Sequence, residues 1–123
     1  MLLATITDQI IGAAISVHRQ LGPGLLESAY QTCFAIELND RGIEFEREVS
    51  LSLEYNGRIV RDVYRIDFVV EQQVIVELKS VDKLAPIHTA QLMTYQKLTN
   101  CRVGLLFNFN TEVLIHGMRR IVL

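Results

Sequence analysis

Residues Arg61–Ser80, R-D-V-Y-R-I-D-F-V-V-E-Q-Q-V-I-V-E-L-K-S, form the stretch that decides the predicted fold. Two segments within it, Val63–Val70 and Val74–Ser80, are rich in Val, Ile and Phe, which favour a pleated and buried surface. The three polar residues between them, Glu71–Gln73, are typical of a short turn. We therefore expect a β-hairpin with its turn at these residues.

Three charged residues, Asp67, Glu77 and Lys79, lie inside this apolar hairpin. Because side chains alternate along a strand, Glu77 and Lys79 share one face, and folding the hairpin brings Asp67 close to Glu77. Buried carboxylates are costly unless they are neutralised, and a divalent cation is a suitable partner for their oxygens. One hypothesis is a Mg²⁺ (or Mn²⁺) site for phosphodiester hydrolysis, with the backbone carbonyl of Leu78 as a further ligand and the lysine orienting water or stabilising the transition state. The alternative is a structural ion pair between the lysine and one carboxylate.

The length and composition point to one compact domain. The 123 residues predict a single domain over residues 1–123, and we attribute the 50% hydrophobic content to a filled core and a surface for self-association. A homodimer through the first helix or the last strands is one expectation. No apolar run approaches the roughly 18–20 residues of a membrane span, and no targeting segment is recognisable, so we expect a cytoplasmic protein without membrane contact. Cys33 and Cys101 fit neither a zinc site nor a disulfide framework and are expected to be buried free thiols.

The charge balance is mildly acidic, with a net charge of −2. A protein that holds nucleic acid mainly by neutralising phosphates is usually basic, so this balance disfavours a strong non-specific binder. It is compatible with an enzyme whose acidic site offsets basic residues elsewhere. Arg61 and Arg65 alternate with Asp67 and could contact phosphates, although solvation of an edge strand explains them as well.

The remaining segments predict an α/β domain in which helices flank a mixed sheet. Asn56-Gly57 is a strong hairpin signal and joins a strand of alternating pattern to the strand that begins at Arg58. The order is α-α-β-β-β-α-β, followed by a last hairpin around Gly117. The predicted helices are Thr5–Leu21, Leu25–Asp40 and Pro86–Leu98, and the predicted later strands are Arg102–Asn108, Val113–His116 and Arg119–Val122.

Five polar residues on the predicted helices are further candidates for a site. Glu27 could bind the metal or orient water, or it could be a solvated glutamate that stabilises the first turn of its helix. Gln91 could bind a phosphate or the attacking water, or it could be an exposed amide. Tyr30 is expected to fix Glu27 through its hydroxyl, and Tyr95 to support Gln91 or to pack in the core. His88 is either a proton shuttle or a polar surface residue.

The segment Gly24–Tyr30, G-L-L-E-S-A-Y, resembles the motif that names the GxxExxY family. Further segments resemble this family in the same order along nearly the whole chain: R-I-D-F-V-V, V-I-V-E-L-K, H-T-A-Q-L-M-T-Y, R-V-G-L-L-F-N-F and R-R-I-V-L. The family is placed in the PD-(D/E)xK nuclease-like superfamily, whose core is α-β-β-β-α-β. One departure is Ile66, where the founding motif has proline.

The resemblance implies a restriction-endonuclease-like core and assigns roles to five residues. It makes Asp67 the first acidic ligand, and Glu77 and Lys79 the (D/E)-x-K pair. Glu27 corresponds to the glutamate often present on the preceding helix, and Gln91 to the glutamine on the following one. The implied function is Mg²⁺-dependent hydrolysis of DNA or RNA. The alternative is a non-catalytic module with a nuclease fold that acts through partner binding or oligomerisation.

Overall fold

The computed structural model describes residues 1–123 and contains three α-helices, a five-stranded sheet and one short 3₁₀-helix. The predicted α/β class and the order α-α-β-β-β-α-β are confirmed. In chain order the elements are α1 (Ala4–Leu21), α2 (Glu27–Asp40), β1 (Phe45–Tyr55), β2 (Arg58–Val70), β3 (Val74–Lys79), α3 (Pro86–Thr99), β4 (Val103–Asn108), η1 (Leu114–Gly117) and β5 (Met118–Val122).

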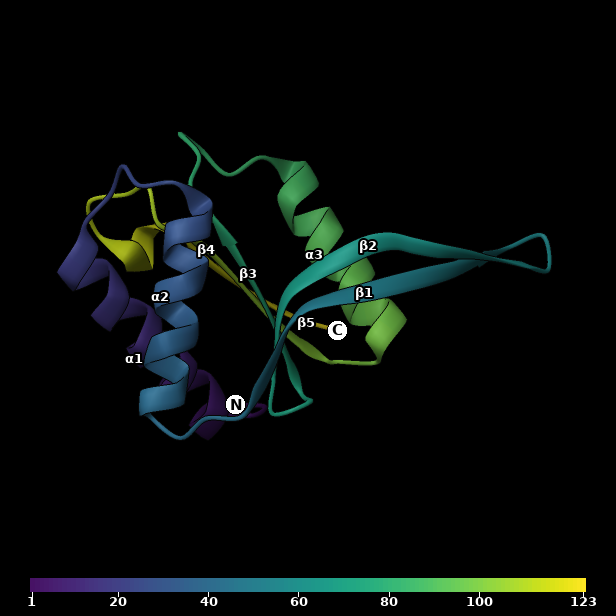
Figure 1. The fold of residues 1–123 in the computed structure, drawn as a ribbon, viewed down its shortest axis with the longest axis horizontal. Helices are drawn as coiled ribbons and strands as arrows, with labels where there is room; N and C mark the ends of the chain where they lie inside the picture. The colour runs from purple at the N-terminus through teal and green to yellow at the C-terminus, as the bar shows by residue number, and fades with distance from the viewer.

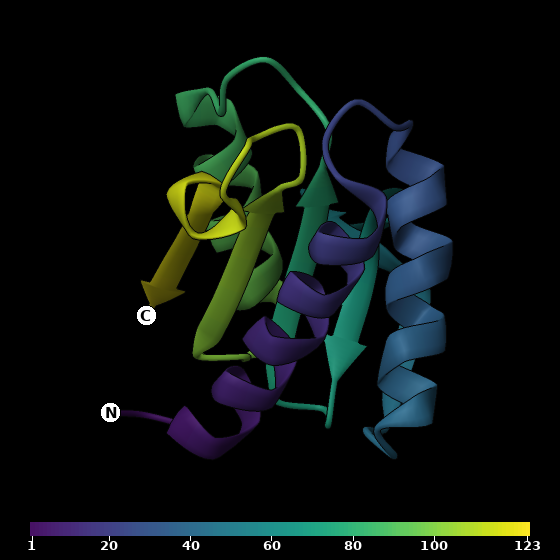
Figure 2. The ribbon, with the colours of Figure 1, turned by 90° about the vertical axis from the view of Figure 1, so that its left-hand side faces the viewer.

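The sheet is mixed and has the strand order β1-β2-β3-β4-β5. All neighbouring strands are antiparallel except β3 and β4, which run parallel because α3 connects them as a crossover. Helices α1 and α2 cover one face of the sheet and α3 covers the other (Figures 1 and 2). None of the three helices combines the length and the hydrophobicity that crossing a bilayer requires.

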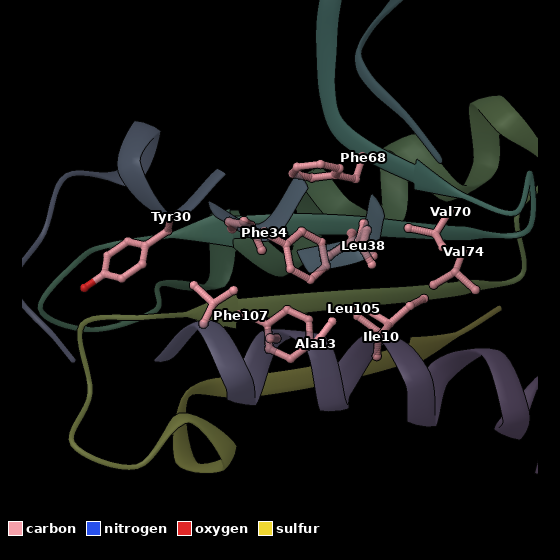
Figure 3. Packing of buried hydrophobic residues seen from close by; sticks show 14 of the residues in the cluster. Ile10, Ala13, Tyr30, Phe34, Leu38, Phe68, Val70, Val74, Leu105 and Phe107 are labelled. Carbon is pink, nitrogen blue, oxygen red and sulfur yellow. The ribbon is translucent and has the colours of Figure 1, made fainter. Parts of the chain in front are cut away.

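The sheet separates two hydrophobic cores. The larger one lies under α1 and α2, where Phe34 packs edge-on against Phe68 with ring centroids 4.9 Å apart (Figure 3). The smaller one lies under α3 and includes Ile75, Leu92 and Tyr95. The residues of β3 therefore alternate between two buried environments, which explains the continuous apolar character of the central strands.

Strands β1 and β2 continue beyond the sheet as a long two-stranded extension (Figure 1). We call residues 47–66 the arm. Strand β2 pairs with β3 only from Phe68 to Val70, so the rest of β2 is bound to β1 alone. The turn at its tip consists of Asn56 and Gly57, whose φ values of 50° and 74° are those that a tight hairpin requires. The arm thus leaves the sheet at the residue that precedes Phe68, which is Asp67.

The prediction of a last hairpin around Gly117 is wrong. Residues 114–117 form η1, and β5 begins at Met118 and pairs with β4 rather than with the preceding segment. Leu114 and Gly117 are buried while the residues between them are exposed, which is the three-residue period of a 3₁₀-helix. A Cβ at Gly117 would lie 2.6 Å from the carbonyl oxygen of Asn108, so this close approach requires glycine.

Two further expectations need adjustment. Helix α2 begins at Glu27, two residues later than expected, because Leu26 is extended with φ −69° and ψ 149°. Cys33 and Cys101 are both free thiols, but only Cys101 is buried, and Cys33 is half-buried on α2.

Candidate active site

Asp67 and Glu77 lie side by side where β2 leaves β3. The backbone ladder between these strands ends at the pair Phe68–Val76. One residue further, the N–H of Asp67 donates a hydrogen bond to Glu77 Oε2 at 2.6 Å, and the N–H of Leu78 donates one to Asp67 Oδ2 at 2.9 Å. The two carboxylates therefore replace the carbonyl acceptors that a continued ladder would supply. We call Asp67, Glu77 and the backbone of Leu78 the fork.

The fork raises the pKa of both carboxyl groups. Burial, together with the negative charge of Asp67, raises the pKa of Glu77 to about 8. Burial also raises the pKa of Asp67, against the opposing effect of the hydrogen bond from Leu78. Since Glu77 is only 4% exposed, its carboxylate gains little solvation from water. At neutral pH the pair therefore retains a proton.

Lys79 follows Glu77 on the same face of β3 and is half-buried. Its positive charge opposes the effect of burial on the pKa of both carboxyl groups of the fork. The two salt bridges of the chain, formed by Arg41 with Glu37 and by Arg65 with Glu48, do not involve it. The alternative interpretation of Lys79 as half of a structural ion pair is therefore wrong, and its ammonium group remains available near the fork.

Glu27 is brought to the fork by the turn that precedes α2. Ser80, directly after β3, donates a hydrogen bond from Oγ to the carbonyl oxygen of Leu25 at 2.6 Å. The hydroxyl of Tyr30 donates to the carbonyl oxygen of Gly22 at 2.5 Å and accepts from the N–H of Leu25 at 3.2 Å. The negative charge of Glu27 adds to the effect of burial on the pKa of both fork carboxyl groups. The hydroxyl of Tyr30 thus holds the turn, and the expected contact with the Glu27 carboxylate is replaced by contacts with backbone.

Helix α3 supplies Tyr95 on the other side. Burial, together with the charges of Glu77 and Asp67, raises the pKa of Tyr95 to about 12, so its hydroxyl lies near the fork. Its ring packs against Tyr64 of the arm at 5.7 Å between centroids. Gln91 is half-buried one helical turn earlier and shows no hydrogen bond to the fork. The Nδ1 atom of His88 accepts a hydrogen bond from the N–H of Ala85 at 2.9 Å, so this ring caps the start of α3.

Two residues near the site were not predicted. The amide of Gln31 opposes the effect of burial on the pKa of Asp67, so it faces that carboxylate. It lies four residues after Glu27 on α2, and this spacing on one helix face was the available signal. Asn108 ends β4 beside Lys79 and exchanges two hydrogen bonds with the backbone of Val81, at 2.8 and 3.1 Å. A polar residue at the end of a fully apolar strand was the signal for it.

A cleft opens beside Asp67 on the side of the arm. Its volume is about 300 Å³. Helix α2 contributes Gln31 to its wall, and the remaining lining residues come from β1 and β2: Arg47, Glu48, Arg65, Asp67 and Phe68. The cleft therefore connects the fork to a surface that carries two arginines.

The fork offers carboxylate oxygens of the kind that Mg²⁺ prefers. No three His, Cys, Asp or Glu side chains lie close enough together to form a metal-binding group, so Glu27 does not join the two fork carboxylates in a common cluster. Two carboxylates nevertheless fit Mg²⁺, which keeps several water ligands and needs few from the protein. The raised pKa of Glu77 fits as well, since a cation would displace its proton and stabilise the ionised pair.

Comparisons with known proteins show the family of the chain. A sequence model described as the PD-(D/E)XK nuclease superfamily matches residues 4–121. Among solved structures, the crystal structure of SSO0001 is similar, with 17% sequence identity, a TM-score of 0.47, and coverage of 95% of this chain and 65% of that chain. The chain thus spans just under two thirds of that protein's length. A search of curated proteins gave no significant match.

Proposed function

Because the chain belongs to the PD-(D/E)XK nuclease superfamily, we propose that it hydrolyses phosphodiester bonds of DNA or RNA with Mg²⁺ or Mn²⁺ as cofactor. The observation that carries the proposal is the fork, where a half-buried and a buried carboxylate lie side by side and a lysine follows two residues after the second. Within the superfamily we assign the chain to the GxxExxY family, on the motif Gly24–Tyr30 at the start of α2.

Each residue near the fork has a distinct part in the proposed reaction. Asp67, Glu77 and the carbonyl oxygen of Leu78 would hold the cation, which when bound makes a water molecule more acidic and offsets negative charge on the phosphate. The ammonium group of Lys79 would stabilise the charge that builds on the phosphate oxygens or orient the attacking water. Glu27, from the opposite side of the fork, would orient the same water. Gln91 would bind a phosphate oxygen from α3.

Replacement of Lys79 tests this proposal most directly. We expect Lys79→Ala to lower kcat by about 10²–10³-fold, since it removes one group that stabilises the transition state. The measurement is cleavage of single-stranded DNA, duplex DNA and RNA in Mg²⁺ and in Mn²⁺. Lys97→Ala, which removes an exposed lysine of α3, is the matched control and should leave kcat unchanged.

Binding and folding measurements complete the test. Lys79→Ala should keep the thermal unfolding midpoint and the Mn²⁺ affinity of the wild type, because the lysine is not a metal ligand. Cleavage by Lys79→Ala at the wild-type rate would remove the lysine from the mechanism. A wild-type protein that neither binds Mn²⁺ nor cleaves any substrate of the panel would support the non-catalytic module instead.

A further inference from the structure

We propose that the cleft between α2 and the base of the arm binds a phosphate group of the nucleic-acid strand, next to the phosphate that reacts at the fork. Arg47 and Arg65 are the residues that contact this phosphate. Glu48 forms an ion pair with Arg65 when no phosphate is bound. This inference rests on the proposed function and extends it, because it names how the flanking part of the substrate is held and in which direction the strand runs, from the fork toward the arm.

The position of the cleft places a bound anion beside the fork. Asp67 lines it, so an anion inside the cleft lies next to the fork. Adjacent phosphates of one strand are separated by a single nucleoside, and the volume of about 300 Å³ admits a group of this size beside the fork rather than a whole duplex. Of the six lining residues, two are arginines, whose planar donors match the oxygens of a phosphate.

The ion pair between Arg65 and Glu48 indicates where an anion can bind. Arg65 Nη2 lies 2.7 Å from Glu48 Oε1, and the two side chains are 64% and 54% exposed. An ion pair with this exposure is weak, because both charges are well solvated. A phosphate therefore replaces the glutamate on Arg65 at little cost, and the pair marks the place where an anion is bound.

Arg47 reaches the same cleft in a prepared orientation. Its guanidinium carbon lies 5.5 Å from the centre of the Phe68 ring, so one face of the planar group rests on an aromatic ring. This contact orients the side chain and leaves the N–H donors at its edge available to an anion. Arg47 of β1 pairs with Phe68 of β2, and Phe68 directly follows Asp67. The same short segment of β2 therefore positions both Arg47 and the fork.

The backbone at Glu48 departs from regular strand geometry beside the cleft. Glu48 has φ of +57°, in the left-handed region that is unusual for this residue type. The pairing of β1 with β2 runs through Arg47–Phe68 and Val49–Ile66 and omits Glu48 and Asp67 between them. The arm therefore bends where it passes the fork, and strained backbone of this kind is often found at binding sites.

The test compares variants that should change the affinity for nucleic acid in opposite directions. Binding of a fluorescein-labelled single-stranded DNA, and of the RNA of the same sequence, is measured by anisotropy in EDTA. We expect Arg65→Gln and Arg47→Gln each to weaken binding by roughly tenfold, and each to reduce the slope of log affinity against log salt by about 0.7. Glu48→Gln should instead tighten binding severalfold, because it frees Arg65 and removes a like charge from the phosphate.

Two controls separate this site from general electrostatics and from folding defects. Glu54→Gln makes the same change of net charge on an exposed position of the arm and should have a smaller effect than Glu48→Gln. In the double variant Glu48→Gln/Arg65→Gln the gain should disappear, because no arginine is freed. Thermal unfolding midpoints should differ little among the variants, since an exposed ion pair contributes little to stability.

The outcomes also distinguish this proposal from the proposed function. Under Mg²⁺, Arg65→Gln should raise KM far more than it lowers kcat, whereas Lys79→Ala should lower kcat. If Glu48→Gln matches Glu54→Gln and Arg65→Gln binds like the wild type, the phosphate site is wrong while the nuclease proposal stands on the Lys79→Ala result. A wild-type protein that binds neither strand overturns the phosphate site as well, and its cleavage assay then decides the nuclease proposal separately.

Discussion

Glu77 is the residue whose chemistry depends most on its surroundings. Its Oε2 atom accepts the N–H of Asp67 at 2.6 Å, and the side chain is almost completely buried. One hydrogen bond favours the ionised form, but burial and the neighbouring carboxylate outweigh it and raise the pKa to about 8. Without a cation, the folded protein therefore favours the protonated form of this group.

The raised pKa makes the stability of the metal-free protein depend on pH. Because the folded protein binds the proton of Glu77 more tightly than the unfolded chain does, this contribution to stability is complete below pH 4.5 and is lost as pH rises through about 8. We expect the free energy of unfolding in EDTA to fall by on the order of a few kcal/mol over this interval. Urea unfolding at a series of pH values measures it.

Glu77→Gln is the matched variant for this prediction. Its amide does not titrate, so the variant should not show the loss of stability that the wild type shows as pH rises through about 8. The free energy of unfolding of the variant should therefore rise relative to that of the wild type with increasing pH. Mg²⁺ should restore part of the lost stability of the wild type at high pH, since a cation favours the ionised pair, and should have no such effect on the variant. Parallel pH profiles for the two proteins would contradict the assignment of the effect to Glu77.

At the scale of elements, the site depends on how the start of α2 is attached to the end of β3. Ser80 and Tyr30 make this attachment through hydrogen bonds to the backbone of the turn that precedes Glu27. The ring of Tyr30 stacks on Phe109 at 4.6 Å between centroids, with its hydroxyl pointing away from the apolar cluster (Figure 3). The same side chain thus belongs to the core at one end and to the turn at the other.

Tyr30→Phe should separate these two contributions. It keeps the stacked ring and removes the hydroxyl, leaving one backbone donor and one backbone acceptor of the turn without their partner. We expect a loss of about 1–2 kcal/mol in the free energy of unfolding, and a lower kcat because Glu27 is held less firmly. Thermal unfolding and cleavage assays measure the two effects.

Tyr64→Phe is a suitable control for this variant. It removes a hydroxyl from a half-buried tyrosine of the arm while its ring contact with Tyr95 remains. Its kcat should stay close to that of the wild type. An unchanged kcat in Tyr30→Phe, together with the expected loss of stability, would show that the turn contributes to folding alone.

The arm differs from the rest of the sheet in the way it is supported. Beyond the fork, β1 and β2 pair only with each other, and two-stranded ribbons are marginally stable by themselves. Tyr64 and Ile66 pack against α3 at the base of the arm, but Tyr55 and Ile59 near its tip are 66% and 65% exposed. The base that carries the proposed phosphate contacts is therefore anchored, while the tip is not.

At the scale of the whole molecule, residues from both sides of the sheet meet at one end of it. Helices α2 and α3 lie on opposite faces of the sheet (Figure 1), and Glu27 of α2 and Tyr95 of α3 both lie near the fork. The cleft that adjoins this site carries two arginines, although the chain as a whole has a net charge of −2.

The net negative charge of the chain leaves few basic residues to contact phosphates, so we expect a weak salt dependence of nucleic-acid binding. If Arg47 and Arg65 supply the main phosphate contacts, the slope of log affinity against log salt should be about −1.4 for a single strand, at about 0.7 per contact. Anisotropy titrations over a range of NaCl concentrations measure this slope. A slope several times steeper would show that a larger basic surface, beyond the cleft, takes part in binding.

Local sequence patterns were sufficient for most of the fold. Apolar spacing located the three helices to within two residues at their ends, and Asn56-Gly57 located the tip of the arm. The segment 113–117 was misjudged because its three consecutive apolar residues, Val113–Ile115, suit a short strand as well as a 3₁₀ turn. What decided between them was the position of Asn108 against Gly117, a contact between segments that no local pattern describes.

The sequence by itself determined the layers, the strand order of the hairpins and the proximity of Asp67 to Glu77, because each follows from spacing along a short stretch. Only the tertiary structure decided that the two carboxylates take over the hydrogen bonds of an interrupted ladder. It also decided that Gln31 and Arg47 lie beside them, whereas the alternation along β2 had already placed Arg65 on the face of Asp67. The physical reason is that burial and backbone bending depend on what packs from distant parts of the chain, and these set the pKa values and the shape of the fork.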